Sequence, residues 1–291
     1  MLNYIANLVT VTGTSMILAL SLNLLIGYAG IFSMAHAVFY GVGAYVAALL
    51  GLYYSADLAI AIPVAMISGA VASLLISLPA LRVRGEYFVA ASLGLQVIAS
   101  TIFEQWDSVT GGLSGLSGIP VAELFGYELA SPTVFMIVTI VLVVFVALVV
   151  ICLLRTSFGR DLRAIRDDET AAGAVGKNVT TIKAIAVAVS AALCTVGGVL
   201  YAYNIAFVNP ESFTLNLSVL VMAMVIIGGA GTTIGPIVGA AIIQFLPAAL
   251  SWLPLPSQNI GYLQQILYGV AMVLLMIYRP AGLLGKARAK A

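Results

Sequence analysis

The chain has 291 residues, of which 62% are hydrophobic and 8% charged, and its formal net charge is +1. A soluble domain carries about 25% charged residues, because its surface needs a polar cover that this composition cannot provide. The composition therefore excludes a water-soluble globular protein. It predicts an all-α protein that crosses a lipid bilayer several times, since a helix satisfies its own backbone polar groups. The near-neutral charge indicates no nucleic-acid partner.

Several apolar segments along the chain are long enough to cross a membrane. A transmembrane helix needs about 20 mostly apolar residues. This criterion predicts spans at 6–26, 33–52, 58–81, 87–103, 132–154, 184–204 and 261–278.

The stretch 217–250 is too long for one ordinary span, and glycine and proline interrupt its middle. The residues concerned are Gly228, Gly229, Gly231, Gly235 and Pro236. Because both residue types weaken a helix, we expect two short membrane segments joined by a tight turn, in which these residues have a structural role. A similar run, Gly27-Tyr-Ala-Gly30, occurs in the first half, and paired glycine interruptions are typical of transport pathways.

All twelve basic residues lie in three places, which predict the orientation of the chain. These places are the loop with Arg82 and Arg84, the loop 155–183, and the tail from Arg279 onward. Basic loops face the cytoplasm. The second loop and the tail share a side only if an even number of spans separates them, which the division of 217–250 provides. We therefore predict an outward N-terminus and nine spans, with eight or ten left open.

The sequence lacks the residue patterns of the common hydrolytic sites. It contains no HExxH, no GxSxG and no GxxxxGK[ST] phosphate loop. No Asp, Glu, Lys or Arg lies near the centre of a predicted span, which weakens a proton-driven carrier. We expect a non-catalytic protein without a metal site, and a stand-alone secondary transporter stays open because sodium can bind to backbone carbonyls.

The loop 104–131 is the longest on the predicted outer side. It is acidic and contains Thr110-Gly-Gly-Leu-Ser-Gly-Leu-Ser-Gly-Ile-Pro120. The loop is either a flexible connector or a structured mouth that turns back towards the membrane. Gly111 and Gly112 supply backbone freedom for a turn, or amide donors for a carboxylate.

The basic loop 155–183 contains a pattern typical of a short amphipathic helix over 160–176. Leu162, Ile165 and Ala172 can share one face, and Ala164, Ala171 and Val175 another. Gly176 fits a helix stop, with Asn178 beyond it. Such a helix could dock into a groove on a partner, and a solvated loop that obeys the positive-inside rule is the alternative.

Here the sequence resembles a known family. Glu169-x-Ala171-Ala172-x-x-x-Gly176 resembles the EAA loop of ABC importer permeases, which forms the coupling helix gripped by the ATPase subunit. The preceding residues from Gly159 to Glu169 are similar to branched-chain amino acid permeases of the LivM type. The resemblance implies ATPase coupling through Arg160, Arg163, Ala164, Arg166, Asp168, Glu169, Ala171, Ala172 and Gly176.

Further blocks of the family follow in order along nearly the whole chain. They begin at Gly30, Arg84, Thr110, Gly228 and Arg279. One departure is Leu113-Ser114, where the family often has a Pro-Asn pair, in a loop that the resemblance associates with the substrate route.

The resemblance also indicates a substrate pathway near His36, Gly41, Tyr45, Gly111, Gly112 and Ser114. Gly41 suits close helix packing. We expect His36 near the outer end of its span, as a structural histidine more than as a ligand.

The family implies one transmembrane permease domain over 1–291, in a bacterial inner membrane. Its expected function is import of branched-chain or related amino acids. Its implied partners are a LivH-like permease, two ABC ATPases that use ATP and Mg, a periplasmic substrate-binding protein and the lipid bilayer, with no cofactor on this chain. Urea, short amides and aromatic acids are alternative substrates.

Overall fold

The computed structural model describes residues 2–80 and 86–250, together with 263, 266–270, 273–274, 277–278 and 282–285. Its long helices are α1 (Leu2–Asn23), α2 (His36–Tyr54), α3 (Leu58–Ala80), α4 (Glu86–Gln105), α6 (Pro132–Arg155), α9 (Val179–Ile205), α10 (Leu215–Gly228) and α11 (Ile234–Leu250). Within the described part, seven helical segments are long and apolar enough to cross a membrane. The prediction of an all-α protein with many spans is confirmed.

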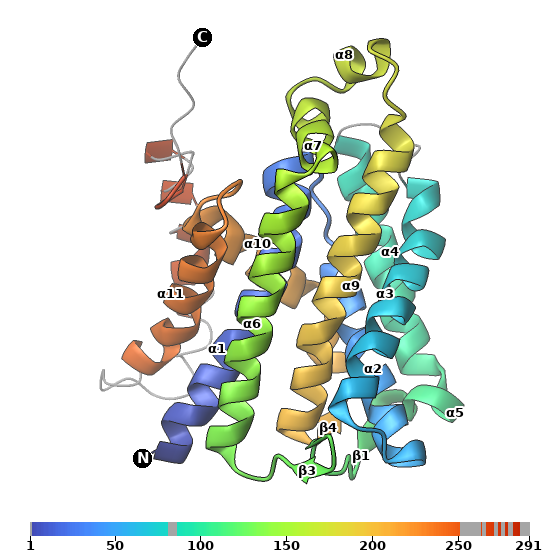
Figure 1. Cartoon of the computed structure of the whole chain (residues 1–291), viewed down its shortest axis with the longest axis vertical. Coiled ribbons are helices and arrows are strands. Elements are labelled where there is room, and N and C mark those ends of the chain that lie inside the picture. Colours follow the sequence, from blue (N-terminus) through green and yellow to red (C-terminus); the bar gives the residue numbers. More distant parts are fainter. Residues whose placement is uncertain are drawn as a thin grey trace.

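The long helices lie side by side, and their connections gather at the two ends of the bundle (Figure 1). Two short helices, α7 (Ser157–Asp167) and α8 (Glu169–Ala174), lie at one end, which we call the α7 end. The N-terminus and helix α5 (Asp107–Thr110) lie at the other, which we call the loop end.

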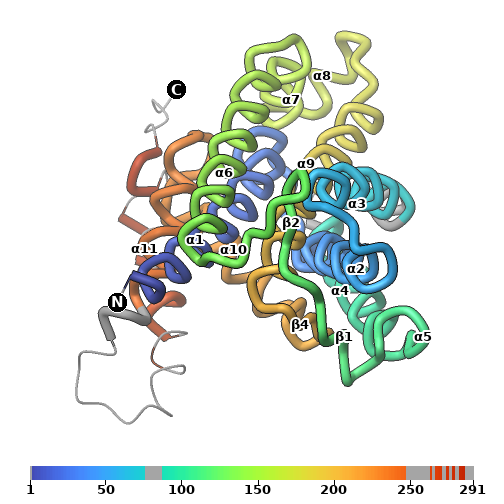
Figure 2. Tube along the Cα trace, turned by 60° about the horizontal axis from the view of Figure 1, so that its bottom comes forward, coloured from blue at the N-terminus to red at the C-terminus, as the bar shows by residue number. Residues whose placement is uncertain are grey.

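Helix α9 lies in the middle of the bundle, between α1 and α6 on one side and α2 and α3 on the other (Figure 2). Small residues let it approach α2 at backbone distance. A Cβ added at Gly198 would lie 2.1 Å from the carbonyl oxygen of Tyr40, and one at Gly43 would lie 2.3 Å from that of Thr195. Close approach of this kind stabilises helix pairs in lipid, where burial of apolar surface between helices gains little.

The outer face of the bundle is apolar, as a lipid environment requires. Helix α6 is the clearest case, because only 22% of its most apolar stretch of 18 residues is buried inside the protein. Its exposed side chains include Ile137, Val141, Phe145 and Leu148. In water such a surface would be an association site, whereas hydrocarbon solvates it.

The predicted division of the stretch 217–250 is confirmed. Helix α10 ends at Gly228 and α11 begins at Ile234. Gly229 and Gly231 between them have φ angles of 117° and 80°, which glycine adopts without a steric penalty. A Cβ at Gly228 would lie 1.9 Å from the carbonyl oxygen of Gly235, so the two helices touch through their backbones. Pro236 stands in the first turn of α11, where the missing N–H removes no helical hydrogen bond.

A short C-terminal segment forms hydrogen bonds with the last carbonyl groups of α10. The backbone N–H groups of Leu283 and Leu284 donate to the carbonyls of Ile227 and Gly228, at 3.0 and 3.1 Å. The predicted loop with Arg82 and Arg84, part of the predicted span 261–278, and the basic residues of the tail lie outside the described residues. The total of nine spans therefore stays a prediction.

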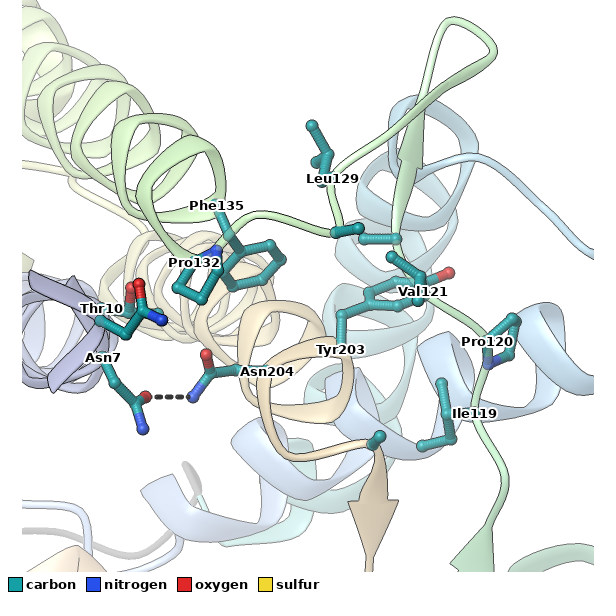
Figure 3. Close-up of a pocket in the computed structure, with 14 residues that line it drawn as sticks. Asn7, Thr10, Ile119, Pro120, Val121, Leu129, Pro132, Phe135, Tyr203 and Asn204 are labelled. Atoms are coloured by element: carbon teal, nitrogen blue, oxygen red, sulfur yellow. Dashed lines mark hydrogen bonds between the residues drawn. The ribbon is translucent and has the colours of Figure 1, made fainter.

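The loop 104–131 is structured, as one of the two expectations had it. After α5 come the 3-10 turn η2 (Gly112–Ser114) and strand β1 (Leu116–Ser117), which pairs antiparallel with β4 (Phe207–Val208). A hairpin of β2 (Glu123–Leu124) and β3 (Tyr127–Glu128) follows. A second 3-10 turn, η3 (Pro210–Phe213), follows β4. Figure 3 shows Ile119, Pro120 and Val121 passing beside Tyr203, near the end of α9.

Candidate functional site

The predicted helix over 160–176 consists of two helices, with a break at Asp168. The backbone of Asp168 is extended, with φ −155° and ψ 109°, and its carboxylate accepts hydrogen bonds from the amides of Thr170 and Ala171 at 2.8 and 2.9 Å. Asp168 thus ends α7 and caps α8, which the prediction of one helix missed. The stop at Gly176 is confirmed, since its φ is 84° and α8 ends at Ala174.

The two faces predicted for this segment are confirmed. Leu162, Ile165 and Ala172 are buried, with exposed fractions of 0%, 4% and 7%. Ala164, Ala171 and Val175 are exposed. These exposed small and apolar side chains lie at the α7 end, where they suit a docking contact.

Polar contacts fix the α7–α8 pair to the helices on either side. Arg163 donates from Nε to the carbonyl of Gly159 at 3.0 Å and from Nη2 to that of Leu154 at 2.8 Å, which holds the corner between α6 and α7. Glu169 of α8 pairs with Lys183 of α9, with 2.6 Å between carboxylate oxygen and Nζ. Charged donors and acceptors strengthen such bonds, so these contacts hold both helices of the pair in place. Arg160 is exposed on α7.

Replacing Asp168 by alanine should loosen α8. The loss of an N-cap carboxylate costs about 0.5–2 kcal/mol, and a helix of six residues has little else to hold its first turn. We expect faster amide hydrogen exchange over 169–174 in Asp168→Ala and near-normal exchange in Asp168→Asn, which keeps an acceptor. Equal protection in the wild type and Asp168→Ala would show that the cap is dispensable.

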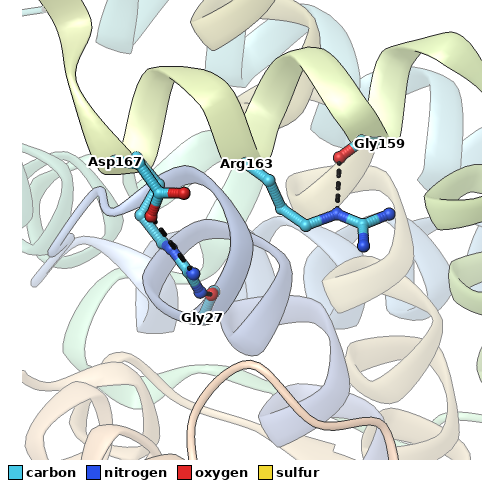
Figure 4. A network of polar contacts seen from close by, with 5 residues as sticks. Gly27, Gly159, Arg163 and Asp167 are labelled. Atoms are coloured by element: carbon cyan, nitrogen blue, oxygen red, sulfur yellow. Dashed lines mark hydrogen bonds and ion pairs between the residues drawn. The ribbon is translucent and has the colours of Figure 1, made fainter. Parts of the chain in front are cut away.

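Arg166 connects α7 to the interior of the bundle. Its Nη1 donates to the carbonyl of Gly27 (Figure 4). Gly27 belongs to η1 (Leu24–Ala29), a π-helical turn that continues α1 and ends at Gly30. A Cβ at Gly30, whose φ is 70°, would lie 2.9 Å from Cγ of Arg166. Gly27 and Gly30, the two glycines of the first motif, therefore both contact Arg166.

The second glycine motif meets the first at the same place. Asn23 has no exposed surface, and its side chain accepts from the amide of Gly231 at 2.9 Å and donates to the carbonyl of Thr232 at 2.8 Å. A Cβ at Gly27 would lie 2.3 Å from the amide nitrogen of Gly231. The two similar glycine runs of the sequence, 27–30 and 228–231, thus pack against each other. We call Asn23, Gly27, Gly30, Arg166, Gly231 and Thr232 the junction.

His36 lies inside the bundle, at the start of α2. It is 1% exposed, and its Nε2 lies 2.8 Å from Oγ of Ser21. His36 therefore lies far from the predicted outer loop 104–131 and not at its side as expected, because the opposite end of α2, at Gly51, contacts Pro120 of the loop end. The non-helical residues 31–35 carry the chain from the α7 end into the bundle before α2 begins.

Serine hydroxyls from other helices support this buried helix start. Ser218 of α10 accepts from the amide of Ala37 at 2.9 Å, and Ser92 of α4 accepts from that of Met34 at 3.0 Å. Backbone groups freed at membrane depth need partners inside the protein. The contact of His36 with Ser21 fits a structural histidine.

The other residues of the expected substrate pathway lie in two places. Gly41 and Tyr45 belong to an aromatic cluster, in which the Tyr45 ring centroid is 5.0 Å from that of Phe103 and 5.8 Å from that of Phe213.

Gly111, Gly112 and Ser114 lie in the loop at the loop end. The amides of Gly111 and Gly112 donate to the Asp107 carbonyl and the Thr110 hydroxyl, at 3.1 and 3.3 Å. These internal partners favour the turn over the carboxylate site.

A bundle with several helices that are long and apolar enough to cross a membrane defines a multi-pass membrane protein. This chain belongs to the family described as branched-chain amino acid transport system permease components, whose sequence profile matches residues 4–276.

Curated relatives cover almost the whole chain. It is 33% identical to the high-affinity branched-chain amino acid transport system permease proteins LivM of Salmonella typhimurium and of Escherichia coli, over 97% of this chain and 70% of each relative. It is 27% identical to a probable LivM of Methanocaldococcus jannaschii, over 94% of this chain and 90% of the relative. No solved structure matches the chain.

Proposed function

We propose that this chain is the membrane permease subunit of an ABC importer that moves branched-chain or closely related amino acids across the bacterial inner membrane. The observation that carries the proposal is the α7–α8 pair, which presents small exposed side chains outward and contacts the bundle interior through Arg166. The names of the LivM relatives support the substrate class.

In this proposal the α7 end faces the cytoplasm, because the exposed Arg155, Arg160, Arg163 and Lys177 lie there. Two separate ATPase subunits bind ATP and Mg, and one of them docks on the α7–α8 pair. A LivH-like permease completes a heterodimer within the lipid, and a periplasmic binding protein delivers substrate at the loop end. The chain itself is one non-catalytic domain over 1–291 without a cofactor.

Coupling then follows from the junction. When the ATPase subunits close, they displace the α7–α8 pair as a unit. Arg166 passes the displacement to the end of α1, and Asn23 passes it to the turn between α10 and α11. Transport requires that ATP binding and substrate binding favour different conformations of the protein. The junction connects α7, the end of α1 and the turn between α10 and α11, so a change at any one of them affects the others.

A bulky substitution on the exposed face of α8 tests this function. Ala171→Trp should remove most co-purification of the ATPase subunits and most ATP-dependent leucine uptake by the complete complex in proteoliposomes, because a large ring cannot enter a contact shaped for alanine. Thr180→Trp, a change of another exposed residue at the same end, is the matched control and should keep both activities.

Full ATPase binding by Ala171→Trp would contradict the docking role of α8. Uptake of urea, short amides or aromatic acids by the wild-type complex, without leucine uptake, would contradict the proposed substrate class. Wild-type leucine uptake that needs no ATPase subunit would favour a stand-alone carrier.

A further inference from the structure

Two cavities lie in series along α1, starting from the loop end. The outer cavity has a volume of about 380 Å³ and is lined on α1 by Asn3, Asn7 and Thr10 (Figure 3). The inner cavity has a volume of about 200 Å³ and is lined on the same helix by residues between Val11 and Leu18. Successive turns of α1 therefore line first one cavity and then the other. None of the six residues of the expected substrate pathway lines either cavity.

Asn204 of α9 lines both cavities. Its amide donates to Oδ1 of Asn7 at 3.1 Å, and Figure 3 shows the two side chains reaching towards each other from α9 and α1. Asn7 is exposed and Asn204 is half-buried. A single hydrogen bond between uncharged side chains contributes little to stability, so this pair can open and close easily.

The inner cavity combines uncharged polar groups with an apolar wall. The polar side chains are those of Thr14, Ser15, Tyr40, Tyr201, Asn204, Ser212 and Gln244. The apolar wall consists of Val11, Leu18, Ile205, Leu217, Val221 and Met224. Two of its polar contacts join different parts of the chain, since Gln244 donates to Ser15 and Tyr201 to Ser212. Its lining contains no Asp, Glu, Lys or Arg.

We propose that the inner cavity binds the transported molecule, an amino acid zwitterion with a small aliphatic side chain, and that the Asn7–Asn204 pair is its outer gate. This inference rests on the proposed function and adds a site to it. Hydroxyl and amide groups can bind both an ammonium and a carboxylate, while the apolar wall accepts the aliphatic side chain. Ligands with a net charge are disfavoured, because burial of an unpaired charge is costly.

The size of the cavity agrees with this ligand. Pockets for drug-sized molecules span about 300–1,000 Å³, and a cavity of about 200 Å³ suits a smaller one. Further along α1, towards the α7 end, Ser21 is fully buried, and it contacts His36 and accepts at its carbonyl from Ser190 at 2.7 Å. Release towards the α7 end therefore requires rearrangement around this contact and the junction.

The first test measures leucine uptake by the complete transporter in proteoliposomes with Gln244→Leu. We expect the leucine concentration at half-maximal uptake to rise by about tenfold, the effect of one lost hydrogen bond, with normal ATPase co-purification. Phe245→Leu, a change of an exposed neighbour on the same helix, should leave both unchanged. An unaltered half-maximal concentration in Gln244→Leu would overturn the assignment.

The second test is independent of the binding protein. In a Cys152→Ser background, which removes the exposed native thiol, Asn204→Cys is labelled with a small thiol reagent in the purified complex. Leucine should slow the labelling and lysine or glutamate should not. Equal labelling with and without leucine, in a complex whose wild type imports leucine, would show that the inner cavity is not the binding site. The proposed function would still stand. Failure of the wild type to import leucine would overturn the proposed function.

Discussion

Asn23→Leu is expected to reduce uptake by about tenfold or more. It leaves the amide of Gly231 and the carbonyl of Thr232 without their partner, and each unpaired buried group destabilises the native arrangement by about 1–3 kcal/mol. The substitution keeps the approximate size of a fully buried side chain, but it removes the hydrogen bonds to Gly231 and Thr232. The turn between α10 and α11 would then no longer follow the end of α1. We expect the protein to insert and to bind its ATPase subunits, with ATP hydrolysis no longer stimulated by substrate.

Thr12→Val provides the matched control for this experiment. Thr12 is 3% exposed on the same helix, and its hydroxyl donates to the carbonyl of Leu8 at 2.7 Å, within α1 itself. Its replacement removes a buried polar group without affecting a contact between helices. If Asn23→Leu transports as well as Thr12→Val, the junction has no part in coupling.

Glu169→Lys should reduce uptake to the background level while the protein still inserts into the membrane. In the native chain Glu169 pairs with Lys183 at 2.6 Å, and the Lys183 side chain is only 13% exposed. Charge reversal places two ammonium groups together where one is largely shielded from water, so α8 should move away from α9. Uptake, insertion and ATPase co-purification are measured together. Normal uptake by the variant would show that Glu169 has no role in coupling.

The double variant Glu169→Lys with Lys183→Glu separates two explanations for that loss. It restores an ion pair between α8 and α9 but presents the opposite charge to any partner. Recovery of ATPase binding would show that Glu169 acts by holding α8 in place, which the structure favours. A double variant as inactive as Glu169→Lys would indicate direct contact between Glu169 and the ATPase.

Much of the helical framework could be predicted from the sequence, because it depends on local patterns. Long apolar runs mark the spans, and the glycines after Ile227 mark the turn between α10 and α11. The spacing of Leu162, Ile165 and Ala172 was enough to identify the buried face of α7 and α8. Each of these inferences uses residues close together in the chain, where helical geometry fixes which side chains share a face.

The junction and the cavities could not be predicted in the same way, since they depend on contacts between distant residues. Asn23 bonds to residues more than 200 positions away, and sequence spacing gives no indication of such a partner. One signal was available, because an asparagine within an apolar span needs a polar partner inside the protein. The break at Asp168 was missed because helical spacing continues across it, although aspartate is a preferred N-cap residue.

The backbone bonds between residues 283–284 and the end of α10 have a practical consequence for handling the protein. Reporter domains and affinity tags are commonly attached at a C-terminus, which is usually loosely held. Here the segment at Gly282 lies against Gly229, so a bulky fusion joined directly after Leu284 would strain the helical hairpin formed by α10 and α11. A long flexible spacer, or attachment at the exposed N-terminal residues, would leave that hairpin free.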